Sequence, residues 1–267
     1  ICDGRCQSRR TAMSGPLLLD LSHTCHTRAR TGIQRVTRSL ERALGPAAIP
    51  ITHDPNQGAW RPLEPWEQAN LLDGSGAKKR GARWPLTARL RGQVRRLLRR
   101  RVPPLPANSG LLMPEVFSAG VALSLPGLFA QAHGPRVAVF HDAIALKLPE
   151  FTAAKTVARF PAYLIELLGF DGIAAVSDDS RLALLDYWRW LGTENPPPVQ
   201  TITLGVDVQQ LSRTAENPRP ASTPIVLSVG SIEGRKNHVA LLEACEQLWT
   251  RGISFDLHLV GLANNET

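Results

Sequence analysis

Two adjacent cations, Arg235 and Lys236, lie between an apolar run and a stretch with helical periodicity. The run Pro224–Val229 is typical of a fully buried strand, and apolar residues recur at helical spacing over Asn237–Trp249. The turn that begins at Gly230 therefore joins the carboxyl end of a strand to the amino end of a helix. In an open α/β sheet this is a place for ligands, and free helix N–H groups favour anions. The pattern predicts a phosphate or diphosphate site, with a solvated basic turn as the alternative.

A histidine and an aspartate, His141 and Asp142, directly follow the apolar run Arg136–Phe140. Polar residues at the carboxyl end of a buried strand lie on the ligand side of a parallel sheet. By position alone, these two residues are the catalytic candidates. The alternative is structural, because Asp142 can cap the following turn and a histidine at a strand end is often only hydrogen-bonded.

A third strand–loop–helix unit begins with the apolar run Pro16–Leu21. Thr31 and Gln34 have the spacing of a capping box, which predicts a helix start at this point. Gly32 has no side chain, so a ligand can approach the backbone closely there. The alternative is that Gly32 is an ordinary residue of a helix start.

Two further polar residues also follow predicted strands. Glu115 follows the predicted strand Gly110–Met113, and Ser177 follows the predicted strand Gly172–Val176. Ser177 also suits the N-cap of the next helix, so its position has a sufficient structural explanation.

The cluster of His23, Cys25 and His26 suggests zinc, but a closed zinc site needs four ligands, and we expect no metal. The four cysteines of the chain are scattered and form no C-x-x-C pair, which suits a reducing cytoplasm.

The net charge of +8 comes from one segment, since eleven Lys and Arg and no acid lie between Gly74 and Arg101. Leucines and a valine form a narrow apolar stripe there, so Arg89–Arg101 reads as a basic amphipathic helix. Such a helix suits an anionic membrane surface. A solvated helix packed by its leucines is the alternative, and nucleic acid is not expected because no aromatic residues are interleaved.

The order of strands and helices predicts an α/β protein with two domains. We interpret residues 1–12 as a non-native leader, 13–210 as a Rossmann-like domain, and 211–223 as a linker. Residues 224–267 then hold the first β-α-β unit of a second Rossmann-like domain, which we expect to be truncated because such a unit cannot cover a parallel sheet.

Five stretches, taken in their order along the chain, resemble the corresponding stretches of glycosyltransferase family 4 (group 1), whose enzymes have the GT-B fold. The stretches are Thr31–Val36, Val139–Asp142 with Leu148–Phe151, Ala174–Ser177, Leu204–Asp207 and Ser228–Asn237.

The resemblance implies transfer of a sugar from a nucleotide-sugar donor to a glycan or lipid-linked acceptor, with retention and without a metal or other cofactor. It assigns the donor diphosphate to Gly32, Gly230, Arg235 and Lys236. His141 maps to the residue that contacts the transferred sugar, and Asp142 is kept with it as a catalytic candidate.

We assign Gln34, Glu115 and Ser177 to acceptor-side or sugar contacts. We expect a cytoplasmic protein, peripheral at the inner face of the membrane.

Two departures from the family remain. Ser231 stands where relatives often have arginine, and the paired glutamates of the family lie downstream of residue 267, so we expect the chain as it stands to be nearly inactive. The alternatives are a GT-B-like sugar-nucleotide epimerase and a non-catalytic module that binds anions or a membrane surface.

Overall fold

The computed structural model describes residues 15–72, 81–100, 102, 104–107, 109–205 and 223–261. The chain divides into two compact units: Ile1–Asp142 with Ala162–Leu204, and Ala143–Pro161 with Gly205–Thr267. The proposed leader, the three cations at 78–80, Arg101 and nearly all of the proposed linker lie outside the described residues.

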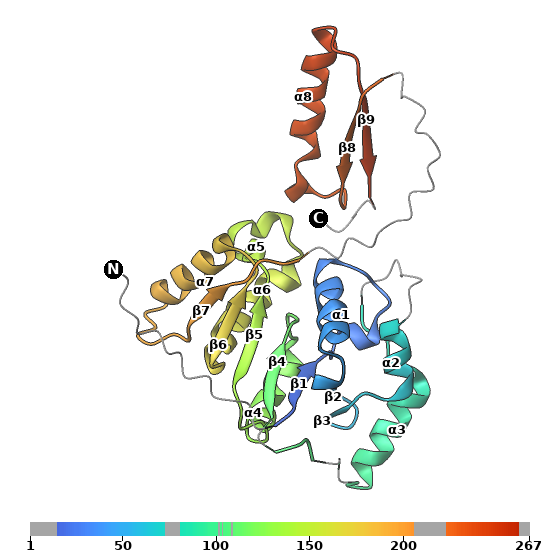
Figure 1. Cartoon of the computed structure of the whole chain (residues 1–267), viewed down its shortest axis with the longest axis vertical. Helices are drawn as coiled ribbons and strands as arrows, with labels where there is room; N and C mark the ends of the chain where they lie inside the picture. The colour runs from blue at the N-terminus through green and yellow to red at the C-terminus, as the bar shows by residue number, and fades with distance from the viewer. Residues whose placement is uncertain are drawn as a thin grey trace, which may run out of the picture. The chain divides into compact units, whose positions relative to one another are not determined.

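The first unit contains a seven-stranded sheet with the order β3-β2-β1-β4-β5-β6-β7 (Figure 1). Every pairing is parallel except that of β3 with β2. The strands are β1 (Leu17–Asp20), β2 (Ala48–Asp54), β3 (Ala59–Pro62), β4 (Gly110–Met113), β5 (Arg136–Phe140), β6 (Gly172–Ala175) and β7 (Val199–Thr201).

Helices connect these strands, and several of them pack apolar side chains on the sheet. They are α1 (Gly32–Leu44), α2 (Pro65–Leu72), α3 (Leu86–Leu97), α4 (Ala119–Phe129), α5 (Ile144–Lys147), α6 (Ala154–Glu166) and α7 (Asp178–Trp190). Of these, α5 and the part of α6 up to Pro161 belong to the second unit. Fully buried side chains come from both layers, among them Leu18 and Phe140 of the strands and Leu164 and Trp188 of the helices. This core fixes the carboxyl ends of the parallel strands.

The strand order reverses direction at β1. From β1 the chain moves outward to β2 and β3, and then returns to the other side of β1 with β4. In open α/β sheets, such a reversal leaves a crevice at the carboxyl ends of the two inner strands, where ligands bind. The residues that follow β1, β4 and β5 therefore lie at the edge of the sheet where such folds bind ligands.

The second unit contains a parallel β-α-β arrangement made of β8 (Ile225–Val229), α8 (His238–Thr250) and β9 (Asp256–Val260). The expectation that β8 is fully buried was wrong, because four of its five residues are exposed. Two strands and one helix cannot cover both faces of a sheet, so the apolar side chains of β8 lack a second layer among the described residues.

The α/β class is confirmed, with a Rossmann-like first unit and a β-α-β arrangement in the second, consistent with a GT-B-type fold. The Pro- and Trp-rich segment after β2 holds β3 and α2, and α2 begins at Pro65, a residue that helices accept in their first turn.

None of the helices in the described part of the chain has both the length and the apolar character needed to cross a membrane.

Candidate functional site

His141 lies directly after β5 and is almost completely buried. Its Nε2 atom is 2.7 Å from the carbonyl oxygen of Pro114, next to the end of β4. A carbonyl oxygen can only accept, so Nε2 carries the proton of this hydrogen bond. The Nδ1 atom has no hydrogen-bond partner among the described residues and is the one available to a ligand.

The backbone of His141 is tied to the start of α7. Ser180 donates from its hydroxyl to the carbonyl oxygen of His141 at 2.8 Å. Ser177 caps α7 by accepting from the Ser180 N–H at 3.1 Å. Ser177 therefore performs the structural role that its position predicted, and it also supports His141 through Ser180. Asp142 is exposed.

Glu115 is buried two residues after β4 and binds the loop that follows β1. Its carboxylate accepts from the N–H of His23 at 3.0 Å, from the N–H of Thr24 at 3.2 Å and from the Thr24 hydroxyl. These bonds satisfy free N–H groups at the start of the short helix Thr24–His26. Glu115 thus fixes this loop in place.

Gln34 reaches the same loop from α1. Its Oε1 atom accepts from the Thr31 N–H at 2.9 Å, which is the glutamine half of the predicted capping box. Its Nε2 atom is 3.3 Å from Nδ1 of His23. Gln34 and Glu115 therefore meet at His23. Gly32 begins α1, and a Cβ atom at this position would have no neighbour within 4 Å, so the space beside it is open.

Asp20, the last residue of β1, is a buried carboxyl group that the sequence reading did not single out. It accepts from the Ser22 N–H at 3.0 Å and from the Ser22 hydroxyl at 2.5 Å. Burial, followed by the charge of Glu115, raises the pKa of Asp20 to about 7. The signal that could have identified Asp20 is the one that identified His141, namely a polar residue at the carboxyl end of an apolar run.

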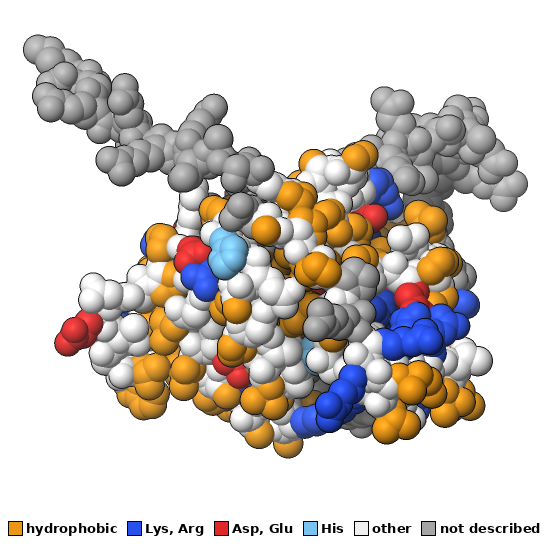
Figure 2. Space-filling model, turned by 90° about the horizontal axis from the view of Figure 1, so that it is seen from below, with side chains coloured by type: hydrophobic (Ala, Val, Ile, Leu, Met, Phe, Trp, Pro, Cys, Tyr) orange, Lys and Arg blue, Asp and Glu red, His pale blue; other side chains and the backbone are white. Residues whose placement is uncertain are grey.

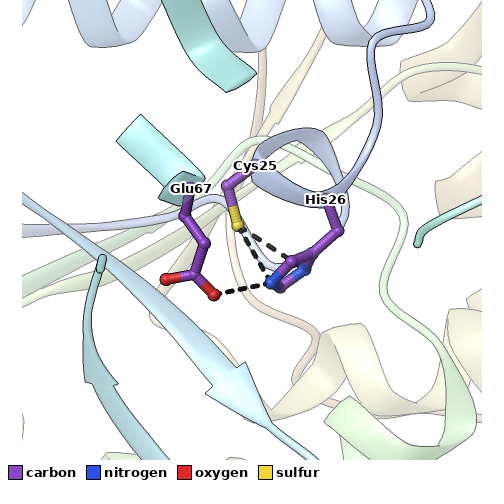
Figure 3. A group of neighbouring side chains, drawn as sticks. All are labelled: Cys25, His26 and Glu67. Carbon is purple, nitrogen blue, oxygen red and sulfur yellow. Dashed lines mark hydrogen bonds and ion pairs between the residues drawn. The ribbon is translucent and has the colours of Figure 1, made fainter. Parts of the chain in front are cut away.

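Cys25, His26 and Glu67 place a sulfur, a ring nitrogen and a carboxylate oxygen within 4.8 Å of one another (Figure 3). Both ring nitrogens of His26 already face oxygen atoms. Nδ1 is 2.7 Å from the Ser22 carbonyl, and Nε2 is 2.8 Å from Glu67. Burial and the charge of Glu67 raise the pKa of the Cys25 thiol well above its usual value, which disfavours the thiolate that a metal needs.

The carboxylate of Glu67 is bound by Arg61 at 2.7 and 2.9 Å, and Arg61 also donates to Asp54 at 3.1 Å. Hydrogen bonds from His26 and Arg61 outweigh burial and lower the pKa of Glu67 to about 2. The ring of His26 packs against Trp84, with centroids 4.0 Å apart. The group is therefore a buried charge network, a geometry that favours a structural role over a metal site.

The predicted anion site of the second unit has the expected local structure. Gly234–Lys236 forms a short 3-10 helix, and α8 begins immediately after Asn237, whose side chain caps it. Arg235 forms an ion pair of 2.6 Å with Glu233. Lys236 has no ion pair among the described residues, and its Cε atom lies 4.0 Å from where a Cβ of Gly230 would be. Gly230 and both cations thus lie in one turn.

The structure therefore brings together the candidates of the first unit in two groups. Glu115 and Gln34 meet at the loop after β1, and His141 and Ser177 are linked through Ser180. Gly230, Arg235 and Lys236 form a separate group in the second unit.

The chain is similar to three curated proteins of Escherichia coli, each named serotype-specific mannosyltransferase WbdA. Each comparison gives 28% identity over 262 residues, which cover 92% of this chain. The chain spans about three tenths of the length of these relatives, with 30%, 30% and 29% covered. No family model matches the chain.

Proposed function

We propose that this chain belongs to a glycosyltransferase that moves a sugar from a nucleotide-sugar donor to a glycan or lipid-linked acceptor. The observation that carries the proposal is the turn Gly230–Lys236, which presents two cations at the start of α8. The similarity to mannosyltransferases over 92% of the chain supports the same reading. Mannose is therefore the first donor sugar to test.

In this proposal, the donor diphosphate binds Lys236, Arg235 and the backbone around Gly230. Gly32, which the family resemblance also assigns to the diphosphate, is the corresponding candidate in the first unit. When the bond between the sugar C1 and the diphosphate breaks, an acceptor oxygen bonds to C1 and its proton leaves with the diphosphate. Fixed cations stabilise the negative charge that develops on the diphosphate. We assign retention of configuration and no metal to this reaction.

His141 contacts the transferred sugar in this proposal. Its Nε2–H is held by Pro114, so Nδ1 is the atom that accepts from a sugar hydroxyl. Asp142 remains a candidate beside it. Gln34, Glu115 and Ser177 act on the acceptor side through the loop and the helix start that they fix. We also propose a cytoplasmic protein in contact with the membrane surface.

The test is calorimetric binding of a mannose nucleotide to the full-length protein and to its Lys236→Ala variant. We expect the variant to lose roughly 1.5–3 kcal/mol of binding free energy, the scale of a hydrogen bond to a charged group. Arg251→Ala, a cation at the other end of α8, is the matched control and should bind normally. Equal affinity of the Lys236 variant and the parent would overturn the diphosphate assignment.

A second measurement separates transfer from epimerisation. The full-length protein is incubated with the nucleotide sugar alone and then with acceptor glycans. We expect a new glycosidic bond only when the acceptor is present. Release of an epimerised nucleotide sugar in the absence of acceptor would exclude the transferase.

A further inference from the structure

The helix α3 is held to the first unit by its small residues. Ala88 and Gly92, one helical turn apart, are the buried residues of α3. A Cβ atom on Gly92 would lie 2.7 Å from Cβ of Asn56, in the loop between β2 and β3. The face that contains Ala88 and Gly92 is therefore the one that docks on the protein.

The apolar residues of α3 lie on the opposite face. Leu86, Leu90, Val94 and Leu97 recur at helical spacing and are 74%, 62%, 52% and 83% exposed. The alternative of a solvated helix packed by its leucines is wrong for this segment, because the docking face is already occupied by Ala88 and Gly92. The leucine stripe, as we call these four residues, is unpartnered among the described residues.

Arginines border the leucine stripe. Arg91 and Arg95 form ion pairs with Glu64 at 3.1 and 2.9 Å. The other arginines of this segment have no ion pair within the described part of the chain: Arg89, Arg96, Arg99 and Arg100. On the face of the molecule drawn in Figure 2, Lys and Arg side chains gather in one part beside hydrophobic ones. The helix α3 itself contains no acidic residue.

A cavity beside the end of α3 adds little free positive charge to this surface. Its volume is about 370 Å³, and its lining includes Arg61, Arg95 and Arg100. Of these, Arg61 is compensated by Glu67 and Asp54, and Arg95 by Glu64. The uncompensated charge of the cavity is that of Arg100.

We infer that α3 lies flat on an anionic lipid bilayer, with the leucine stripe inserted between the lipid headgroups and the arginines on the lipid phosphates. Apolar side chains and flanking cations on one exposed helix face are the combination by which amphipathic helices bind membrane interfaces. Nucleic acid would use the arginines but leave the leucine stripe exposed. A second copy of the chain would cover the leucine stripe but bring the arginines together. The inference deepens the membrane contact proposed above by naming the helix that makes it, and it does not depend on the sugar transfer.

The test is co-sedimentation of the chain with vesicles of phosphatidylcholine alone, and with vesicles containing about one third phosphatidylglycerol. We expect binding to the anionic vesicles and little to the neutral ones. Leu90→Ser with Leu97→Ser should lower the partition coefficient about tenfold or more, since two inserted apolar side chains are lost. Arg89→Gln, Arg96→Gln and Arg99→Gln together should lower it by a similar or larger factor.

The substituted side chains of the leucine variant are exposed, so its thermal unfolding should match that of the parent. The matched controls are Leu123→Ser on α4, 86% exposed, and Arg189→Gln on α7, and both should bind like the parent.

Unchanged vesicle binding by the leucine variant would overturn the inference. So would binding of a nucleic-acid oligonucleotide that is stronger than vesicle binding and unaffected by the leucine substitutions. A dimer that the leucine substitutions dissociate, in a chain that does not bind vesicles, would assign the leucine stripe to a second copy.

Discussion

The carboxyl groups around the loop after β1 in the first unit and the cations of the turn Gly230–Lys236 in the second unit are held in opposite ways. In the first, Asp20, Glu115 and Glu67 are buried, and other groups of the protein bind each of them. In the second, Lys236 has no ion pair among the described residues, and Arg235 is fixed by Glu233. Burying a charge without a partner costs free energy, whereas an exposed cation is solvated and remains able to bind a ligand. The first region is therefore rigid, and the second is where we propose that the diphosphate binds.

The largest expected effect tests the rigidity of the first region. Glu67→Ala leaves Arg61 and His26 without their shared carboxylate in a buried setting. We expect the free energy of unfolding to fall by about 3–5 kcal/mol, the cost of breaking a buried pair by removing one partner. Urea denaturation followed by circular dichroism measures the loss.

Glu64→Ala is the matched control for this prediction, because Glu64 pairs with Arg91 and Arg95 nearer the surface. It should cost about 1 kcal/mol or less. If the two variants lost the same free energy of unfolding, the network around Glu67 would contribute no more stability than a surface ion pair.

The second prediction concerns pH. The pKa of Asp20 is raised from 3.8 to about 7 by burial and by Glu115, so the folded state keeps a proton that the unfolded chain releases between these values. The free energy of unfolding should therefore fall as pH rises from 4 to 7, by up to about 4 kcal/mol from this group. Urea denaturation at several pH values measures the slope.

Asp20→Asn removes the titrating group and should flatten that slope. Glu67 acts in a separate window, because its pKa is lowered to about 2 and its contribution is lost only as pH falls from 4.5 to 2. An unchanged slope between pH 4 and 7 in the Asp20 variant would contradict the assignment.

A smaller effect is expected from Glu233→Ala in the second region. This change frees Arg235 from its ion pair, so the arginine must be ordered when the ligand binds. We expect nucleotide-sugar affinity to weaken by about 1 kcal/mol, the cost of ordering one long side chain. Calorimetry on the full-length protein gives the value. Tighter binding would show that Glu233 competes with the diphosphate instead of orienting Arg235.

The smallest effect on stability is expected from Gly32→Ala. A Cβ atom there meets nothing within 4 Å, so the variant should be as stable as the parent or up to about 1 kcal/mol more stable. Affinity for the nucleotide sugar should nevertheless fall, since the methyl group occupies the space of the close approach. Retained affinity would favour the reading of Gly32 as an ordinary helix-start residue.

Local patterns were sufficient to predict most of the first unit. The predicted runs Pro16–Leu21, Gly110–Met113 and Arg136–Phe140 contain β1, β4 and β5, and helices begin after the capping residues Thr31 and Ser177. Periodicity does not predict α2, because its Pro- and Trp-rich sequence shows little of it; the helix is stabilised by its contacts, among them the bonds of Glu67. Among the site residues, Glu115 and Gln34 were singled out by their positions after a strand and at a helix start. The sequence does not show that both contact His23, which lies 92 and 11 residues away.

The sequence alone determined the α/β class, the positions of the strand ends and the cations that follow Gly230, because these depend on short-range periodicity and on the residue types themselves. Only the tertiary structure decided which of these groups share an environment. Burial beside Glu115 raises the pKa of Asp20, the packing of Ala88 and Gly92 turns the leucine stripe outward, and Arg61 engages the carboxylate of Glu67. Charge and burial act through space, so residues far apart in the chain set one another's chemistry only after the chain has folded.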